Sequence, residues 1–306
     1  MQVLLAGVYR RDSKRTVDNH FADNEPLHTD VPRRVRSGQV TAQEPHIILA
    51  ELWFEDEPEI DRAALLSRVR EHLPESELKP DGPVLVAHLR YQHTYADGER
   101  GPIITALLEA GAGRRSLKHE PDTTQTYDWD EADAVLERCG HSLLVTELFG
   151  RLHPYENRVD AYRTTLTAAV ELLAPAAVWC PNSTRVIEPA VLLDDPAAPF
   201  VNVRMFRIEG EPGILVMDTL GLHVLGLPDF QCHFRDLEPG RMAAKLYDLA
   251  AYVLENGDVI ESGHTVSGVG DEEHWRCQRE DALVAPDRLV LDIDPGEPFA
   301  AGKRDP

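Results

Sequence analysis

Three short polar turns carry the residue types that could do chemistry in this chain. Cys180 ends an apolar segment, and a cysteine thiol with a distant histidine could be a nucleophile. His264 could titrate near neutral pH. An enzyme would need Cys180, His264 and Asp218 within reach of one another, in a cleft where the turns converge. That candidate cleft consists of Trp179, Cys180, Asn182, Asp218, Thr219, Gly221, Gly263, His264 and Thr265.

The same residues also have a structural interpretation. Cys180 is typical of a buried thiol at a strand end, and Trp179 is typical of a core or a pocket wall. Asp218 and Thr219, followed by Gly221, are typical of a strand that ends in a turn, where their side chains bond backbone N–H groups. The sequence leaves both interpretations open.

No common catalytic, nucleotide-binding or metal-binding motif occurs in the chain. Cys232 and His233 are adjacent, so on a strand they face opposite sides and could not easily share a metal ion. We expect no metal and no cofactor. Glu51 and Glu147 interrupt apolar strands and would have raised pKa values if they pointed inward, but we expect them on the exposed face.

Hydrophobic patterning over residues 45–180 predicts alternating strands and helices. The expected strands are His46–Phe54, Val84–Tyr91, His141–Phe149 and Pro175–Cys180. The expected helices are Ile60–Leu73, Ile103–Ala110, Asp130–Cys139 (with Asp128 as N-cap) and Tyr155–Leu173. Residues 46–91 and 141–180 would form two β-α-β units of similar length, which could be a repeat.

The last third predicts a hairpin followed by a long helix. Phe200–Ile208 and Ile214–Thr219 are the hairpin strands, and Pro239–Glu255 has a continuous apolar stripe. Val259–Ile260 and Arg288–Ile293 are expected as short strands. The order of elements indicates an α+β fold, in which helices pack on one face of a mixed, largely antiparallel sheet.

The expected domain organisation is an arm, one domain and a tail. Residues 1–44 form a basic, partly irregular arm with a short strand at Gln2–Tyr9, and residues 295–306 form a frayed tail. Residues 45–294 form the α+β domain, which could divide into lobes 45–150 and 151–294.

Charge and cysteine content narrow the function classes. The net charge is -22, and residues 1–40 are basic, so the remaining chain is more acidic still. Such a chain repels nucleic acid and anionic lipid, so we expect neither nucleic-acid nor membrane binding, and a basic protein is the expected partner. Four cysteines without a CxxC pair and no long apolar run indicate a cytoplasmic protein.

Residues 178–268 resemble the bacterial family catalogued as domain of unknown function 4261. The resemblance rests on Val178–Ser183, on Thr219-Leu220-Gly221-Leu222 with Gly226 and Asp229-Phe230-Gln231, and on Asn256-Gly257 before Gly263-His264-Thr265. The stretches 46–54 and 129–150 fit in kind, so the resemblance covers roughly residues 46–268. Cys180-Pro181 and Gln231 depart from the pattern. The resemblance implies no known reaction. The family is similar to families found near bacterial toxin–immunity loci.

These observations favour a non-enzymatic, acidic binding protein, an immunity-type or regulatory partner of a basic protein. The alternative is an enzyme or small-molecule binder that uses the cleft of polar turns. A third hypothesis is a subunit of a larger assembly that docks through the face of the helix at 239–255.

Overall fold

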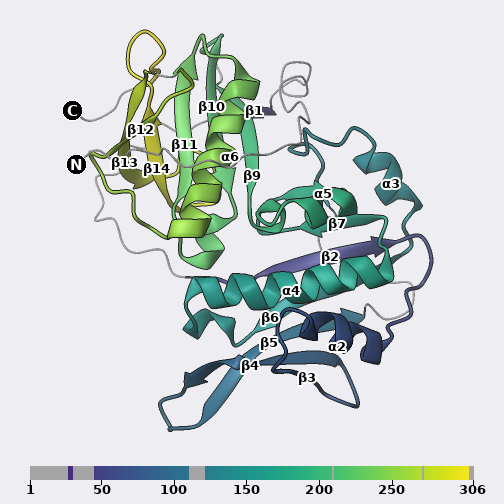
Figure 1. The fold of residues 1–306 in the computed structure, drawn as a ribbon. Helices are drawn as coiled ribbons and strands as arrows, with labels where there is room; N and C mark the ends of the chain where they lie inside the picture. The colour runs from purple at the N-terminus through teal and green to yellow at the C-terminus, as the bar shows by residue number, and fades with distance from the viewer. Residues whose placement is uncertain (1–26, 30–44, 110–120, 209, 271, 303–306) are drawn as a thin grey trace. The chain divides into compact units, whose positions relative to one another are not determined.

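The chain folds into two compact units (Figure 1). The computed structural model describes residues 27–29, 45–109, 121–208, 210–270 and 272–302. The middle unit is Pro45–Phe200, and the C-terminal unit is Val201–Pro306 with Met1–Glu44. The division therefore falls after residue 200 and not after residue 150, because strands on both sides of residue 150 share one sheet. Most of the expected basic arm, with its strand at 2–9, lies outside the described residues.

The middle unit is built on a seven-stranded antiparallel sheet with the order β3-β4-β5-β6-β2-β7-β8. Its strands are β2 (Leu49–Phe54), β3 (Ser76–Leu78), β4 (Val84–Thr94), β5 (Arg100–Glu109), β6 (His141–Leu148), β7 (Ala177–Cys180) and β8 (Arg185–Ile187). The expected helix at 103–110 is wrong, because this segment is β5. β5 lies between β4 and β6, with Ile103 and Leu107 buried on one face and Ile104 and Leu108 half-buried on the other, so apolar residues occur on both faces and period 2 is hidden.

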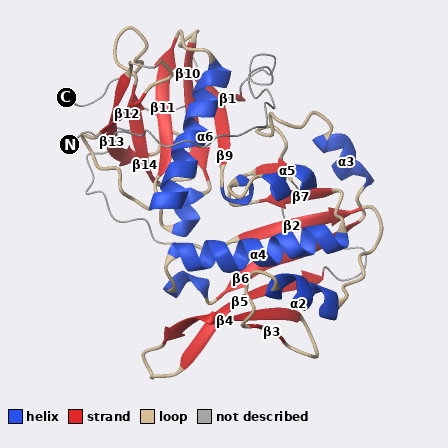
Figure 2. Ribbon diagram, viewed as in Figure 1, coloured by secondary structure: helices blue, strands red, loops and turns tan. Residues whose placement is uncertain are grey.

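The helices of the middle unit cover both faces of its sheet. They are α2 (Arg62–Arg70), α3 (Ala132–Arg138), α4 (Tyr155–Leu173) and α5 (Pro189–Asp194), with 3-10 turns η1 (Gly150–Leu152) and η2 (Ala198–Phe200). Figure 2 shows α4 lying along the sheet, and α2 packs against α4. α3 instead packs on Trp53 and Trp179. Trp53 pairs with Ser142 across the two strands, so both side chains lie on the same face of the sheet. Glu147 is an odd number of positions after Ser142 and lies on the opposite face, where it pairs with Arg158 of α4.

The C-terminal unit is a second seven-stranded sheet, with the order β1-β9-β10-β11-β14-β13-β12. Its strands are β1 (Leu27–Thr29), β9 (Asn202–Ile208), β10 (Ile214–Leu220), β11 (Asp229–Arg235), β12 (Thr265–Ser267), β13 (His274–Asp281) and β14 (Leu289–Asp294). β1/β9 and β11/β14 are parallel pairs, and the others are antiparallel. η3 (Leu222–Leu225) connects β10 to β11, and α6 (Pro239–Asn256) packs across β9, β10 and β11. The α+β class is thus confirmed.

The two units share one arrangement of elements. In each, three consecutive antiparallel strands are followed by a long helix that packs on all three: β4-β5-β6-α4 and β9-β10-β11-α6. Each helix then leads to a strand parallel to the third one, β7 or β12. The repeat in the fold therefore lies at 84–180 and 202–267, and not at 46–91 and 141–180 as the strand and helix lengths indicated.

Two expectations for the C-terminal region are wrong. Val259–Ile260 is not a strand, although Ile260 is buried. The tail is not frayed over residues 295–302, because Ala300 bridges to Phe234 and Ala301 is buried. Sequence reasoning saw only the Gly/Pro content of this tail and not the neighbouring strand β11 that holds it.

Candidate functional site

Asp218 lies on β10 with its carboxylate between two arginine side chains. Arg204, its cross-strand neighbour on β9, donates from Nε at 2.9 Å and from Nη2 at 2.6 Å. Arg288, just before β14, donates from Nη2 at 2.6 Å. All three residues are buried. The carboxylate is therefore held by charge-assisted hydrogen bonds, which are the strong class in proteins.

Asp229, the first residue of β11, holds the turn between β10 and β11. Its carboxylate accepts from the Thr219 hydroxyl at 3.0 Å and from the amides of Leu222 and His223 at 3.2 and 3.4 Å. Nε of Arg288 donates to it at 3.1 Å, and Nδ1 of His223 lies 3.1 Å away. One buried carboxylate thus holds the η3 turn in place through these hydrogen bonds.

Gly221 lets this turn form. Its φ of 132° is accessible to glycine and strained for other residues. Asp218, Thr219 and Gly221 from the predicted cleft are therefore neighbours in the structure. They form part of the connection from β10 to β11 at one end of the sheet.

The charges of this network balance. Asp218 and Asp229 oppose Arg204 and Arg288, and all four are buried. Burial alone would raise the pKa of Asp229, but the hydrogen bond from His223 and the positive charge of Arg288 lower it below its usual range. Burial would lower the pKa of Arg288, and the two carboxylates raise it. Asp229 is therefore an ionised acceptor and a poor proton donor.

The same arginines fasten the loop before β14. Arg204 donates from Nη1 to the carbonyl of Ala285 at 2.9 Å. Arg288 donates from Nη1 to the carbonyls of Val284 and Pro286, both at 3.0 Å. These carbonyls complete the hydrogen bonding of the guanidinium groups. We therefore assign the network a structural role, since its charged atoms are directed at one another and at backbone.

Gly263, His264 and Thr265 form a separate turn. His264 Nδ1 accepts from the amide of Glu261 at 3.2 Å, and Gly263 donates to the carbonyl of Cys277 at 2.8 Å. Thr265 begins β12, and β11, β14 and β13 separate that strand from β10. Strands are spaced about 4.8 Å apart, so this turn lies roughly four spacings from Asp218 along the sheet. The structure does not bring these two turns together.

Trp179, Cys180 and Asn182 lie in the middle unit. Trp179 belongs to the hydrophobic cluster under α3. Cys180 is fully buried, and burial raises the pKa of its thiol to about 12, which argues against a nucleophilic thiolate. Asn182 accepts from the amide of Leu49 at 3.0 Å and donates to the carbonyl of Ile47 at 3.2 Å. The three residues bind the end of β7 to β2.

Both glutamates expected on an exposed face are buried. Glu51 accepts from the Ser142 hydroxyl at 2.7 Å. Glu147 pairs with Arg158 of α4, whose Nε lies 3.1 Å from both carboxylate oxygens. The expectation was wrong because each strand that carries them is covered on both faces.

Sequence reasoning missed the arginines that complete these networks. Arg158, Arg204 and Arg288 are all buried and all bind carboxylates. A signal was present for Arg204, which stands between Val203 and Met205 in a strand where neighbours are apolar. A buried arginine on a strand requires a carboxylate partner, and Asp218 on the hairpin partner strand was available.

The middle unit contains a second set of buried polar residues, which links β3, β4, β5 and α4. His88 on β4 lies 3.1 Å from Ser76 Oγ, 3.1 Å from Thr105 Oγ1 and 3.2 Å from Thr165 Oγ1 of α4. Burial lowers the pKa of His88 to about 4, so its imidazole is neutral at neutral pH. Hydroxyl groups satisfy both ring nitrogens without adding charge.

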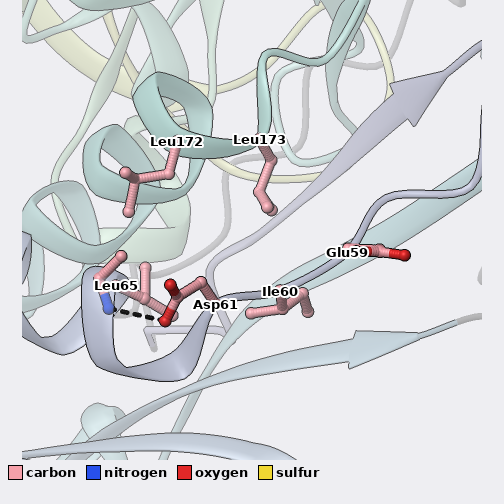
Figure 3. Close-up of a pocket in the computed structure, with 7 residues that line it drawn as sticks. Glu59, Ile60, Asp61, Leu65, Leu172 and Leu173 are labelled. Carbon is pink, nitrogen blue, oxygen red and sulfur yellow. Dashed lines mark hydrogen bonds between the residues drawn. The ribbon is translucent and has the colours of Figure 1, made fainter.

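A small hollow opens between α2 and the end of α4 (Figure 3). Leu65, Leu172 and Leu173 point toward it, and Asp61 caps α2 by accepting from the amides of Ala63 and Ala64. Its volume is about 70 Å³. Ligand pockets are commonly about 300–1,000 Å³, so this hollow is too small for most metabolites.

Acidic side chains gather where β2 ends and around α3. The Glu55 carboxylate accepts from Nε of Arg138 at 2.8 Å, and Gly140 donates to the carbonyl of Phe54. These contacts place the start of segment 55–61 beside residues 138–140, directly after segment 122–137. The exposed acidic residues of the two segments, here called the acidic surface, are Glu55, Asp56, Glu57, Glu59, Asp61, Asp122, Asp128, Asp130, Glu131, Asp133 and Glu137.

The acidic surface rests on a packed base. Half-buried Trp129 packs against the cluster that contains Trp53 and Trp179. Arg185, which is buried, pairs with Asp128. The expectation that Asp128 is the N-cap of α3 is wrong, because Glu131 occupies this position. The surface is fixed by side chains beneath it.

Comparison with known proteins gives one family. Residues 218–294 match the family model described as Domain of unknown function (DUF4261). The match begins at Asp218, so it excludes Val178–Ser183, and it extends through β13 and β14. Asp218, Asp229 and Arg288 all lie within it. No curated protein and no solved structure matches the chain. Across the described residues, no helix could span a membrane, and no group of three or more His, Cys, Asp or Glu is arranged around a metal.

Proposed function

We propose that this protein, which carries a domain of the DUF4261 family over residues 218–294, is an acidic binding protein for a basic protein partner. An immunity-type or regulatory role is the concrete form of this proposal. The observation that carries it is the acidic surface of the middle unit. Eleven exposed carboxylates there are accompanied by the single exposed basic side chain of Arg138.

The arrangement of the acidic surface supports binding in two ways. Carboxylates of one sign raise the rate at which a positively charged partner associates. Trp129 and Arg185 hold the segment 122–137 on a packed cluster, so little side-chain and loop freedom is lost on binding. The middle unit holds 27 acidic and 14 basic residues, a net charge of -13, so a basic partner is attracted to the unit as a whole.

The alternative, an enzyme with a cleft of polar turns, has less support. Asp218 is enclosed by two arginines, Cys180 is a buried thiol, and His264 is on a strand end remote from Asp218 within the same sheet. None of these geometries favours a reaction.

A charge-reversal experiment tests the proposal. The triple variant Asp130→Lys, Glu131→Lys, Glu137→Lys changes exposed residues around α3. The matched control, Glu255→Lys, Glu272→Lys, Asp287→Lys, makes the same change in charge on the C-terminal unit. The unmodified protein, the α3 variant and the control are each used as bait in the native host, and any stoichiometric basic partner is then purified and titrated.

We expect the α3 variant to weaken the purified complex at least tenfold, about 1.4 kcal/mol, and the control to leave it nearly unchanged. Affinity of the unmodified protein should also fall as salt is raised, because exposed charges are screened. A partner that is acidic, or one bound equally by all three proteins, would contradict the proposal.

A further inference from the structure

Two histidines meet at the distal end of the β4–β5 hairpin, away from the acidic surface. His93 lies near the end of β4, and His153 follows the 3-10 turn η1. Their ring centroids are 5.7 Å apart and the rings are tilted by 60°. The two residues come from segments 60 positions apart, so the fold itself brings the imidazoles together.

His153 carries an unsatisfied polar atom. Only 8% of the residue is exposed, and its Nε2 has no hydrogen-bond partner among the described residues. A buried ring nitrogen without a partner is costly, and such atoms are rare in folded proteins. In the tautomer with the proton on Nδ1, Nε2 has a lone pair, and a metal ion that accepts this lone pair would remove the cost.

The separation of the rings suits one metal ion between them. A metal–nitrogen bond of about 2.0 Å and an imidazole radius of about 1.2 Å put the ion roughly 3.2 Å from each centroid. Two such rings are about 5.2 Å apart at a tetrahedral angle and about 6.4 Å apart when opposed. The observed 5.7 Å lies between these limits.

Neighbouring side chains neutralise a nearby charge and hold one of the two imidazoles in place. The nearby charge of Arg158 is compensated by Glu147. Tyr95 packs edge-on against His93, with ring centroids 5.3 Å apart, and its own ring lies against Gly101, where any side chain would collide with it. Tyr95 is thus a positioning residue for His93.

We propose that His93 and His153 form an open two-histidine site for a divalent late transition metal ion. Imidazole nitrogens suit Cu²⁺, Ni²⁺ and Zn²⁺, and Cu²⁺ should bind most tightly of the three. The protein supplies two ligands, which leaves the remaining positions to water or to an external ligand. This site is independent of the proposed protein-binding function.

The test uses the full chain and Cu²⁺ alone as the probe. Copper affinity is measured by calorimetric titration for the unmodified protein and for His93→Ala, His153→Ala and His72→Ala. His72 is exposed at the end of α2 in the same unit, so it controls for adventitious binding to surface histidines. Electron paramagnetic resonance of the copper-loaded protein counts the coordinated nitrogens.

We expect one site that shows two coordinated nitrogens and weakens roughly tenfold or more in either His93→Ala or His153→Ala, since even outer-shell changes cost 10–100-fold. His72→Ala should bind as the unmodified protein does. Melting curves identify a variant that fails to fold, and the other variant then decides. Equal binding by all four proteins, or no binding, would overturn the proposal.

Discussion

Asp229 is fully buried and accepts from Arg288, Thr219 and backbone amides, so its replacement should be costly. In Asp229→Asn, Arg288 loses one of its two carboxylates inside the protein. Breaking a buried ion pair from one side typically costs about 3–5 kcal/mol. We expect the free energy of unfolding, measured by urea titration, to fall by roughly that amount.

The pH dependence of stability gives a second measurement of Asp229. Because its folded pKa is lowered, the carboxylate stabilises the fold above its unfolded pKa of about 3.9, and this contribution is lost as pH falls through the folded pKa. Asp229→Asn should lack that acid-induced loss. Asp287→Asn, at an exposed position next to Arg288, is the control and should behave as the unmodified protein. If both variants lose equal stability, the assignment is wrong.

At single positions, the sequence predicted where the turns lie better than it predicted which side chains bind one another. Asp218 and Thr219 were interpretable as a strand end with side chains that bind backbone, and Thr219 does donate to Asp229 while accepting from the amide of Phe230. The arginines were not predictable from spacing. Arg288 is 70 residues from Asp218, and only strand order in the sheet brings them together.

Among the elements, α6 depends on a cap that the sequence analysis did not assign. Glu238 accepts from the amides of Gly240 and Arg241 at 2.9 and 2.7 Å. We expect Glu238→Ala to lower the free energy of unfolding by about 0.5–2 kcal/mol, since two amides of the first turn lose their acceptor. Urea titration of the purified variant measures it.

Glu255 provides a matched control in the last turn of the same helix. It is exposed, and a negative charge there is unfavourable to the helix dipole. Glu255→Ala should therefore be neutral or slightly stabilising. A loss equal to that of Glu238→Ala would mean that side-chain packing, not capping, explains both.

Long helices were the elements most accessible to prediction. The periodic spacing of apolar residues placed α4 at its observed bounds and α6 within a residue of its end. Strands with apolar residues on both faces were the least accessible. Residues 103–109 of β5 have the apolar content of either a helix or a central strand, and only their pairing with β4 and β6 decides.

For the whole molecule, the order of the predicted elements indicated the α+β class but not the division into units. The middle unit runs from residue 45 to residue 200. In the C-terminal unit, β1 precedes this segment in the sequence and pairs with β9, which follows it. No local pattern records such a pairing, because its two partners are about 180 residues apart. Acidic charge was visible in the sequence, whereas its gathering around α3 required the contact of Glu55 with Arg138.

Acidification should act on the two units in sequence. Unfolded histidine has a pKa of about 6.5, and His88 of the middle unit has its folded pKa lowered to about 4 by burial. Between these values the unfolded chain binds a proton that the folded chain does not, so stability falls as pH falls from about 6.5 to about 4, by up to about 3 kcal/mol. Asp229 of the C-terminal unit acts only below that range.

His88→Gln should reduce the pH dependence between 6.5 and 4 but not remove it, because burial also lowers the pKa of His153. It should leave the loss below pH 4 that Asp229 causes. Urea titrations followed by tryptophan fluorescence measure this. Trp53, Trp129 and Trp179 report on the middle unit, and Trp275→Phe removes the signal of the C-terminal unit. His72→Gln, an exposed position, is the control. If the unmodified protein and His88→Gln lose stability in parallel as pH falls to 4, then His88 is solvated or protonated in the folded chain, and the neutral polar contacts with Ser76, Thr105 and Thr165 do not hold in solution.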